Sequence, residues 1–442
     1  MNTPVYDFLK KYSRSDFLRC HMPGHKGAEF CGLAPEIYSL DITEINGADS
    51  LFESDGIIAE SERNMSSLYN TRATVFSAGG STLCIQAMLY LMKKENRRVF
   101  AVRNVHRAFL NASALLDIDV EWIMPDYSDS LLSGELCLAS VEKLLSECES
   151  SACVYVTSPD YTGKLADIKA LSEICHRYDA RLLVDNAHGA HTAFFPQSLH
   201  PIALGADLCC DSAHKMLPAL TGSALLHTSR EEYAPLLKQA MSIFGSTSPS
   251  YLIMCSLDLC CDYIEKHIRE DIRIGAERIT ALKNNISHLV SFADTEPFHI
   301  TVKAQECGFN GLELADILRS FNVECEYADD SIVILLMAPV NTEKDYDTLE
   351  KALEKALEKA ERHSPAVRKL SLPSPVKAMS IREAVFAPSE EICVNSAENR
   401  ICASVKVPCP PAVPIAISGE LITREHIKIF NRYGIFTVNV VK

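Results

Sequence analysis

Residues 207–227 read DLCCDSAHKMLPALTGSALLH, and they place a lysine, Lys215, between two apolar runs that are typical of buried strands. A buried ammonium group is costly, because desolvation disfavours its charged form and lowers its pKa, and the same shift makes the amine a nucleophile. The alternative interpretation is a lysine at a strand end whose stem packs while its ammonium group reaches water. The sequence on either side is needed to choose between them.

The pattern around this stretch extends from about residue 70 to residue 230. Apolar runs alternate with helix-length amphipathic segments such as STLCIQAMLYLMKK and IKALSEICHRYD, and the runs include ATVFSAGG, RVFAV, CVYVTSP, RLLVDNA and DLCCDS. Strands without alternating polarity, separated by helices, predict an α/β domain with a mostly parallel sheet covered on both faces. In such sheets ligands bind at the carboxyl ends of the strands.

The rest of the chain is organised differently. Residues 250–288 predict two long helices, and PFHITVKA and SIVILLMAP predict strands of a smaller mixed module. The charged stretch YDTLEKALEKALEKAERH predicts a solvated helix, and the Pro- and Ser-rich residues 364–380 predict a linker. We therefore expect an N-terminal segment (1–60), a large α/β domain (61–288), a small α/β domain (289–370) and a C-terminal module (371–442).

Composition excludes several classes of protein. The 442 residues carry a formal net charge of −15 and no basic stripe with interleaved aromatics, which argues against nucleic acid as a partner. The sequence shows neither a signal-peptide core nor an apolar run of bilayer length, so we expect a cytoplasmic protein with no membrane partner. The 17 cysteines form no C-x-x-C pair or compact zinc spacing, and we interpret them as reduced thiols without a metal.

Three features could hold a cofactor. SAGGST, Ser77 to Thr82, ends a strand on two glycines and opens a helix, as phosphate sites do, although a simple tight turn gives the same pattern. Asp185 ends the strand in LLVDNAHGAH, where pairing with a cationic ring nitrogen competes with a helix cap or a salt bridge. Lys215 follows with Ser212 and His214 beside it. Together these features match the requirements of pyridoxal phosphate, namely an imine-forming lysine, a carboxylate for the pyridine nitrogen and a phosphate cradle.

The sequence resembles the ornithine, lysine and arginine decarboxylases of the aspartate-aminotransferase fold (fold type I), especially their shorter bacterial members. The similarity runs through most of the chain, in HMPGHKG (21–27), DITEINGADSLFESDGII (41–58), NVHRAF (104–109), SPDYTGKLADI (158–168), VDNAHGAHTAF (184–194), DSAHKMLPALTGSALLH (211–227), STSPSYLIMCSLD (246–258), MSIREAVFAP (379–388) and VPCPPAVPIAISGELIT (407–423).

The resemblance implies roles for individual residues. Lys215 is expected to form the Schiff base, Asp185 to pair with the pyridinium nitrogen, and His106 to stack on the ring, although His106 taken alone could simply cap a helix. Thr247 is expected to reach the phosphate of a partner subunit, because such sites lie at a dimer interface. The expected cofactor-binding residues are Gly80, Ser81, Thr82, His106, Asp185, Ala187, His188, Ser212, His214, Lys215 and Thr247.

Some positions depart from the pattern of the resembling family. Gly222 stands where glutamine is common, and Asn186 stands where glutamate is common. Asp160 and Thr162 stand where threonine and tyrosine are more frequent, and PPAVP replaces a glycine-containing version. None of these changes removes a group that would hold the cofactor, so they bear on the identity of the substrate.

The expected function is decarboxylation of a basic amino acid, with arginine (to agmatine) favoured over lysine and ornithine. The expected role is polyamine synthesis, and acid resistance is the alternative that stays open. Lys215 or His106 is expected to protonate the product carbon, and the acidic candidates for the distal cation of the substrate are Asp41, Glu44 and Asp55. A homodimer or larger homo-oligomer is implied. Two alternatives remain open, namely another reaction on the same cofactor such as transamination, and a non-catalytic homologue.

Overall fold

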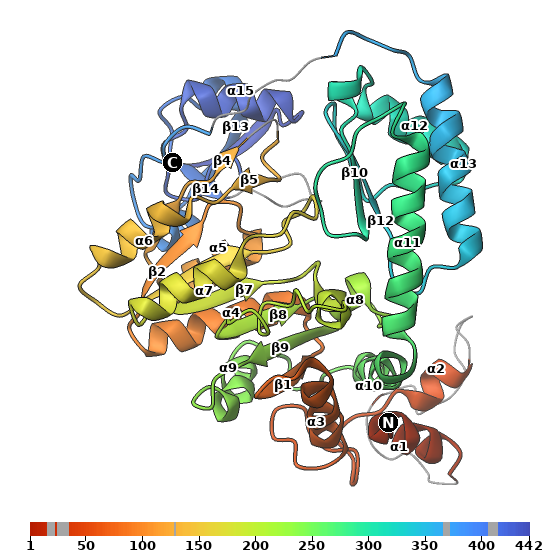
Figure 1. Ribbon diagram of the computed structural model, residues 1–442. Helices are drawn as coiled ribbons and strands as arrows, with labels where there is room; N and C mark the ends of the chain where they lie inside the picture. Colours follow the sequence, from red (N-terminus) through yellow and green to blue (C-terminus); the bar gives the residue numbers. More distant parts are fainter. Residues whose placement is uncertain (16–22, 24–34, 128–129, 366–371, 405–413) are drawn as a thin grey trace. The chain divides into compact units, whose positions relative to one another are not determined.

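The computed structural model describes the chain except residues 16–22, 24–34, 128–129, 366–371 and 405–413 (Figure 1). All but one residue of HMPGHKG and most of PPAVP thus lie outside the described residues. The chain falls into two compact units. The first comprises Met1–Leu91 and Leu182–Arg273, and the second comprises Met92–Arg181 and Ile274–Lys442. The domain boundaries expected from the sequence stay predictions.

The sheet of the first unit has its strands in the order β1 (Ala73–Ser77), β9 (Ala224–Thr228), β8 (Leu208–Asp211) and β7 (Arg181–Asp185). β7 and β8 run parallel, with Asp185 opposite Cys210, whereas β9 runs antiparallel to both of its neighbours. All residues of β8 and β9 are buried, as continuous apolar runs predict. The parallel pairing brings the ends of β7 and β8 to one edge.

The helices of the first unit support this sheet. α1 (Pro4–Ser13), α3 (Ile57–Tyr69) and α10 (Tyr251–Lys266) pack together, and the buried Asp258 on α10 accepts hydrogen bonds from Tyr6 N at 2.9 Å and Ser61 Oγ at 2.5 Å. Burial raises the pKa of Asp258 to about 6. The other helical segments that lie or begin in this unit are α2 (Pro35–Leu40), α4 (Gly80–Lys94), η1 (Ala190–Phe194), α8 (Ala213–Met216), η2 (Ala234–Leu236), α9 (Leu237–Ser242) and α11 (Ile268–Ile286).

In the second unit, β2 (Arg98–Val102) lies between β6 (Ala152–Thr157) and β3 (Val120–Ile123) and pairs in parallel with both. Three helices connect or follow these strands, namely α5 (Arg107–Leu116), α6 (Leu138–Ser146) and α7 (Ile168–Arg177). β4 (Asp126–Tyr127) pairs antiparallel with β5 (Gly134–Glu135). With β7 and β8, these pairings confirm the predicted mostly parallel sheet with intervening helices.

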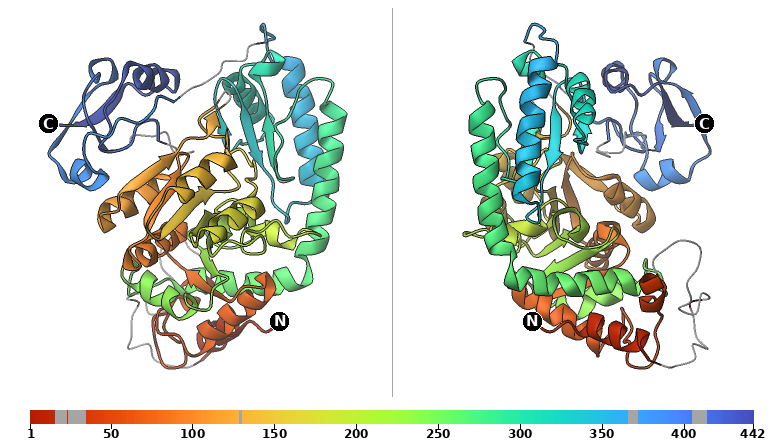
Figure 2. Two further views of the ribbon diagram at one scale, coloured as in Figure 1. Left: turned by 60° about the vertical axis from the view of Figure 1, so that its left-hand side comes forward. Right: turned by 90° about the vertical axis from the view of Figure 1, so that its right-hand side faces the viewer.

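The second unit also contains two small antiparallel sheets. In one, β12 (Val333–Leu336) lies between β10 (His299–Val302) and β11 (Tyr327–Ala328). The sequence predicts β10 and β12 as strands but not the short β11. α12 (Gly311–Ser320) packs on this sheet and on α13 (Glu343–Lys359), the predicted charged helix (Figure 2). η3 (Gln305–Cys307) precedes α12.

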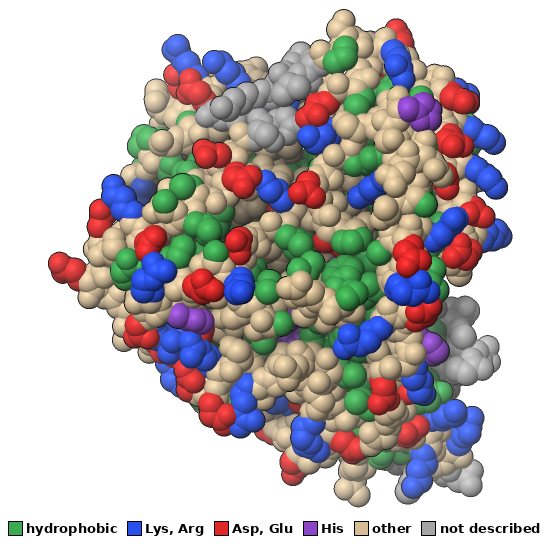
Figure 3. Space-filling model, in the orientation of Figure 1, with side chains coloured by type: hydrophobic (Ala, Val, Ile, Leu, Met, Phe, Trp, Pro, Cys, Tyr) green, Lys and Arg blue, Asp and Glu red, His purple; other side chains and the backbone are tan. Residues whose placement is uncertain are grey.

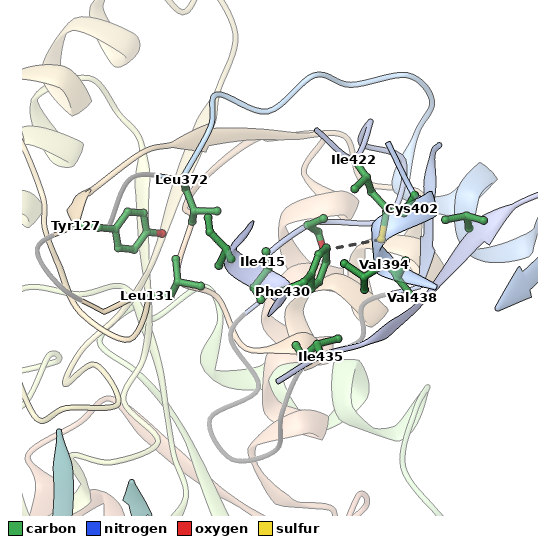
Figure 4. Close-up of a cluster of buried hydrophobic side chains, with 14 residues drawn as sticks. Tyr127, Leu131, Leu372, Val394, Cys402, Ile415, Ile422, Phe430, Ile435 and Val438 are labelled. Carbon is green, nitrogen blue, oxygen red and sulfur yellow. Dashed lines mark hydrogen bonds between the residues drawn. The ribbon is translucent and has the colours of Figure 1, made fainter. Parts of the chain in front are cut away.

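The second small sheet forms the C-terminal module. β15 (Thr437–Val441) lies between β13 (Ser389–Cys393) and β14 (Cys402–Ser404), with α14 (Ile381–Phe386), η4 (Val394–Ser396) and α15 (Arg424–Arg432) beside it. Phe430, Val438 and Ile415 form a buried cluster that also takes in Tyr127 and Leu131 from the β4–β5 segment (Figure 4). Nearby, Arg103 Nη2 pairs with Glu420 Oε2 at 2.8 Å, and both side chains are buried.

The described cysteines are free thiols, and all of those in β8 and α10 are packed in the interior. Burial raises the pKa of Cys209 and of Cys210 well above the ordinary thiol value. On the face shown in Figure 3, acidic and basic side chains are interspersed. Within the described part of the chain, every helix is too short or too polar to cross a bilayer.

Candidate functional site

Lys215 lies on the short helix α8, which begins directly after β8. Its Nζ lies 2.7 Å from Nε2 of His188, a buried imidazole in the turn that follows β7. That turn is closed by a hydrogen bond from Gly189 N to Asn186 O at 2.8 Å. An imidazole nitrogen that accepts a hydrogen bond from an ammonium group can also take its proton, so this contact can supply Lys215 as a neutral nucleophile.

Asp185 is the last residue of β7, and its side chain is buried. One carboxylate oxygen, Oδ1, accepts a hydrogen bond from Ala187 N at 3.2 Å and contacts the thiol of Cys210 at 3.7 Å. Asp185 thus ends one strand while Lys215 follows the end of the neighbouring parallel strand. The predicted carboxylate and the predicted lysine therefore come from adjoining strand ends.

A cradle for an anion lies where β1 turns into α4. Gly80 adopts φ +66°, and its N–H donates to Gly222 O at 2.8 Å. Ser212 Oγ donates to Ser81 Oγ at 2.9 Å, so hydroxyls from the start of α4 and the end of β8 meet. α4 is a helix of 15 residues, and its N-terminal amides and dipole favour a phosphate.

Thr82 is exposed at the start of α4 and lines a cavity of about 330 Å³ with Gly79, Phe52 and the loop that precedes α10. Thr247 is exposed in that same loop, whose Gly245 and Ser248 also line the cavity. The structure thus brings the loop of Thr247 to the cradle of its own chain. The predicted reach of Thr247 into a partner subunit stays a prediction.

His214 and Gly222 fix the turn between α8 and β9. His214 Nδ1 donates to Ser223 O at 2.8 Å, which ties the helix to the start of β9. Gly222 has φ +96°, and a Cβ at this position would lie 3.3 Å from Ile253 Cδ1. Glycine at 222, a departure noted in the sequence, therefore fits the backbone that presents its carbonyl to Gly80.

His106 belongs to the second unit, where it is the N-cap of α5. Its Nδ1 accepts a hydrogen bond from Ala108 N at 3.1 Å, so the capping interpretation is confirmed. Stacking of His106 on a cofactor ring stays a prediction. Two departures also meet in this unit, since Thr162 Oγ1 donates to the buried Asp160 Oδ1 at 2.7 Å and the two residues stabilise one turn.

The acidic candidates for the distal cation lie near the N-terminus of the chain. Glu44 and Asp55 are exposed, and Asp41 is partly buried. The backbone N–H of Asp55 donates to Asp49 Oδ1 at 3.1 Å, so Asp55 lies in a loop organised by a neighbouring carboxylate. The role of these three residues in substrate binding stays a prediction.

The donor set of the first unit fits pyridoxal phosphate. A lysine amine in contact with an imidazole, a buried carboxylate on the next strand end and a helix N-terminus with facing hydroxyls can serve its aldehyde, its ring nitrogen and its phosphate. Gly80 leaves open space where a side chain would begin, so the backbone of the cradle is accessible to an anion. Sequence reasoning missed a further buried group, Asp211 with His200 and His227, because its contacts depend on the register of the sheet.

Comparisons with known proteins identify the family of the chain. The family model described as "Orn/Lys/Arg decarboxylase, major domain" matches residues 3–304. The chain is 28% identical over 458 residues to a protein of Bacillus subtilis named arginine decarboxylase, covering 96% of this chain and 92% of that protein. It is 27% identical to a Bacillus anthracis protein of the same name, covering 97% of this chain and 92% of that protein.

Solved structures show the same fold. The lysine decarboxylase LdcF of Francisella novicida superposes with a TM-score of 0.83 at 15% identity, over 100% of this chain and 81% of that chain. Serine palmitoyltransferase of Sphingomonas wittichii superposes with a TM-score of 0.56 at 12% identity, over 70% of this chain and 79% of that chain. From the family match together with this fold, the chain belongs to the Orn/Lys/Arg decarboxylases, fold type I enzymes that depend on pyridoxal phosphate.

Proposed function

We propose that the protein decarboxylates arginine to agmatine, with lysine and ornithine as the alternative substrates. The observation that carries the chemistry is the contact of Lys215 Nζ with His188 Nε2 at 2.7 Å, on the strand end beside Asp185. The preference for arginine is supported by the two Bacillus relatives named arginine decarboxylase, which match this chain over nearly its whole length.

When bound, pyridoxal phosphate supplies a conjugated ring that accepts the electron pair released as the substrate carboxylate leaves. We propose that Lys215 holds the cofactor covalently and that the Asp185 carboxylate keeps its ring nitrogen protonated. The cradle residues bind the phosphate through hydroxyl, imidazole and amide groups, and they are Gly80, Ser81, Thr82, Ser212 and His214. Each belongs to the first unit, which favours one preorganised site.

His188 and Lys215 form the proposed proton-handling pair. His188 Nε2 takes a proton from Lys215 Nζ, which leaves the amine neutral and nucleophilic. His188 would return this proton to Lys215 Nζ, which would then deliver it to the substrate carbon, with His106 as the second candidate donor. Decarboxylation would need the substrate carboxylate to be left free to depart, whereas an arginine that clamps this carboxylate would favour transamination.

The remaining proposals concern the surroundings of the reaction. Ala187 and His188 lie against the cofactor ring, and His106 stacks on it. Thr247 completes the phosphate site of a partner subunit in a homodimer. The enzyme works in the cytoplasm, where agmatine feeds polyamine synthesis.

The test is carbon dioxide release from arginine, lysine and ornithine in parallel, using purified holoenzyme saturated with pyridoxal phosphate. We expect arginine to respond most strongly and agmatine to appear in equal amount. Lys215→Ala is assayed in the same way as a control. It measures the carbon dioxide that pyridoxal phosphate releases from amino acids without catalysis by the protein. No carbon dioxide from any of the three amino acids would contradict the proposal, and conversion of the cofactor to its amine form would identify transamination instead.

A further inference from the structure

Asp211 is a second buried carboxylate near Asp185, because it directly follows Cys210, the residue that lies opposite Asp185 in the sheet. Asp211, the last residue of β8, is 0% exposed, and its Oδ2 lies 3.2 Å from both His200 Nε2 and His227 Nε2. Its other oxygen, Oδ1, accepts a hydrogen bond from Asn186 Nδ2 at 2.7 Å. Three N–H donors thus converge on one carboxylate that is enclosed by the protein.

The hydrogen bonds around the two imidazoles agree with this arrangement. Ile202 N donates to His200 Nδ1 at 3.4 Å, so His200 carries its proton on Nε2, which faces Asp211. His227 Nδ1 lies 2.8 Å from Thr74 Oγ1, and this hydroxyl can donate to Nδ1 while Nε2–H faces Asp211. Burial alone raises the pKa of Asp211, but His200 and His227 more than offset it and hold this pKa well below its usual value.

Asp211 connects the two segments that carry the site. In the parallel register of β7 and β8, Asp185 lies opposite Cys210, and Asn186 N donates to Cys210 O at 2.9 Å. The Asp211 side chain therefore holds the residue that follows Asp185. On its own strand Asp211 directly precedes Ser212, the N-cap of the helix that carries Lys215.

We propose that Asp211 is a positioning residue whose carboxylate, held by two imidazoles, orients Asn186 and thereby sets Asp185 against the Lys215 segment. This inference rests on the proposed function, because it assigns Asp185 and Lys215 to the cofactor. Asn186 is the matched partner of Asp211, since an amide donates to the carboxylate, whereas a second carboxylate at hydrogen-bond distance in a buried site would be repelled. The pairing gives a physical reason for asparagine at 186, where the resembling family more often has glutamate.

The test is a double-mutant cycle of Asn186→Asp, Asp211→Asn and the two changes combined. The combined variant exchanges the two groups, so the amide nitrogen at position 211 can donate to the carboxylate at position 186, while the amide oxygen accepts from the two imidazoles. A matched control is Asn285→Asp, because Asn285 Nδ2 donates to Glu350 Oε1 at 2.7 Å on the surface. The readouts are the dissociation constant of pyridoxal phosphate from the visible absorbance, kcat and KM, and the melting temperature.

We expect Asn186→Asp to weaken cofactor binding and to lower kcat by at least about tenfold each, at nearly unchanged KM. The combined variant should recover most of both losses, and Asn285→Asp should match the parent. If Asn186→Asp does not fold, recovery of a folded, cofactor-binding protein in the combined variant supports the pairing equally. A combined variant no better than Asn186→Asp overturns the proposal, as does a parental kcat and cofactor affinity in Asn186→Asp.

Two further measurements complete the test. The metal content of the holoenzyme distinguishes the hydrogen-bonded arrangement from a metal site, and carbon dioxide release by the parent distinguishes a failure of this proposal from a failure of the proposed function. His200, Cys209 and Asp211 present donor atoms within 4.8 Å of one another, so a stoichiometric metal ion in the purified holoenzyme, lost in Asp211→Asn, would overturn the hydrogen-bonded arrangement. If the parent releases no carbon dioxide from basic amino acids but the cycle still shows coupled cofactor affinities, the proposed function fails and the positioning role stands.

Discussion

Two regions of the molecule bury charged groups, and the two regions differ in how many of the polar atoms of these groups have hydrogen-bond partners. In the first unit Asp211 receives hydrogen bonds from His200, His227 and Asn186. In the second unit the buried pair Arg103–Glu420 leaves Arg103 Nε and Nη1 and Glu420 Oε1 without hydrogen-bond partners among the residues that the structure describes. A fully satisfied network holds one geometry, whereas a partly satisfied ion pair contributes little net stability. We infer from this contrast that the hydrogen bonds of Asp211 fix the positions of the residues at the ends of β7 and β8. The Arg103–Glu420 pair instead attaches the C-terminal module to the segment that follows β2.

The largest expected effect is the loss of turnover on replacing Lys215, which tests the proposed chemistry of the first region. Lys215→Ala should lower turnover on the order of 10⁴-fold or more, because it removes the amine that we propose holds the cofactor. The visible absorbance of the bound cofactor should disappear, while the melting temperature stays near that of the parent without cofactor. Carbon dioxide release at the parental rate would remove Lys215 from the site.

Removing one partner of the Arg103–Glu420 ion pair in the second region should lower the stability of the protein. Arg103→Met leaves Glu420 buried without its cation and should lower the free energy of unfolding by about 3–5 kcal/mol. Combining it with Glu420→Leu should restore most of this loss, because an apolar pair needs no solvation. Urea titration measures both variants. A single variant as stable as the parent would show that the pair is not desolvated in solution.

Asp185→Asn tests whether the first region acts through charge as well as position. Asparagine keeps the shape of the side chain but cannot stabilise a protonated ring nitrogen, so we expect turnover to fall about 10²–10³-fold while cofactor binding is partly retained. Single-turnover rates and the cofactor dissociation constant separate the two effects. Near-normal turnover would exclude the proposed role of Asp185.

The smallest expected effect concerns Asp258, a buried carboxylate on α10 that contacts neither Asp211 nor the Arg103–Glu420 pair. The pKa of Asp258 is raised to about 6 from 3.8, so the folded protein binds the proton more tightly than the unfolded chain. Its favourable contribution is complete below about pH 4 and is lost as the pH rises through 6, a change of about 2–3 kcal/mol. Asp258→Asn should flatten the dependence of stability on pH in this window, as measured by urea titrations between pH 4 and 7. An unchanged pH dependence would assign it to other groups.

Much of the fold follows from local sequence patterns. Continuous apolar runs predict β6, β7 and β8 as buried strands. The position of Asp185 at the end of β7 and that of Lys215 shortly after the end of β8 follow from the parallel arrangement. The direction of β9 does not, because an apolar run reads the same in parallel and antiparallel pairing. The contacts of Asp211 were also inaccessible, since His200 lies in a loop and His227 in an apolar strand, and only the register of the sheet brings them together.

The cysteines of the interior make the opening of the first unit measurable by chemical labelling. Thiol reagents attack the thiolate, and the raised pKa values of Cys209 and Cys210 keep these two thiols protonated as well as enclosed in β8 beside Asp185. Cys137 is exposed, and a hydrogen bond from Ser140 lowers its pKa, so it should be modified faster than Cys209 and Cys210 and serve as an internal reference. The rate at which Cys209 and Cys210 are modified then reports how often β8 unfolds, and bound pyridoxal phosphate should slow this modification if it binds at the proposed site.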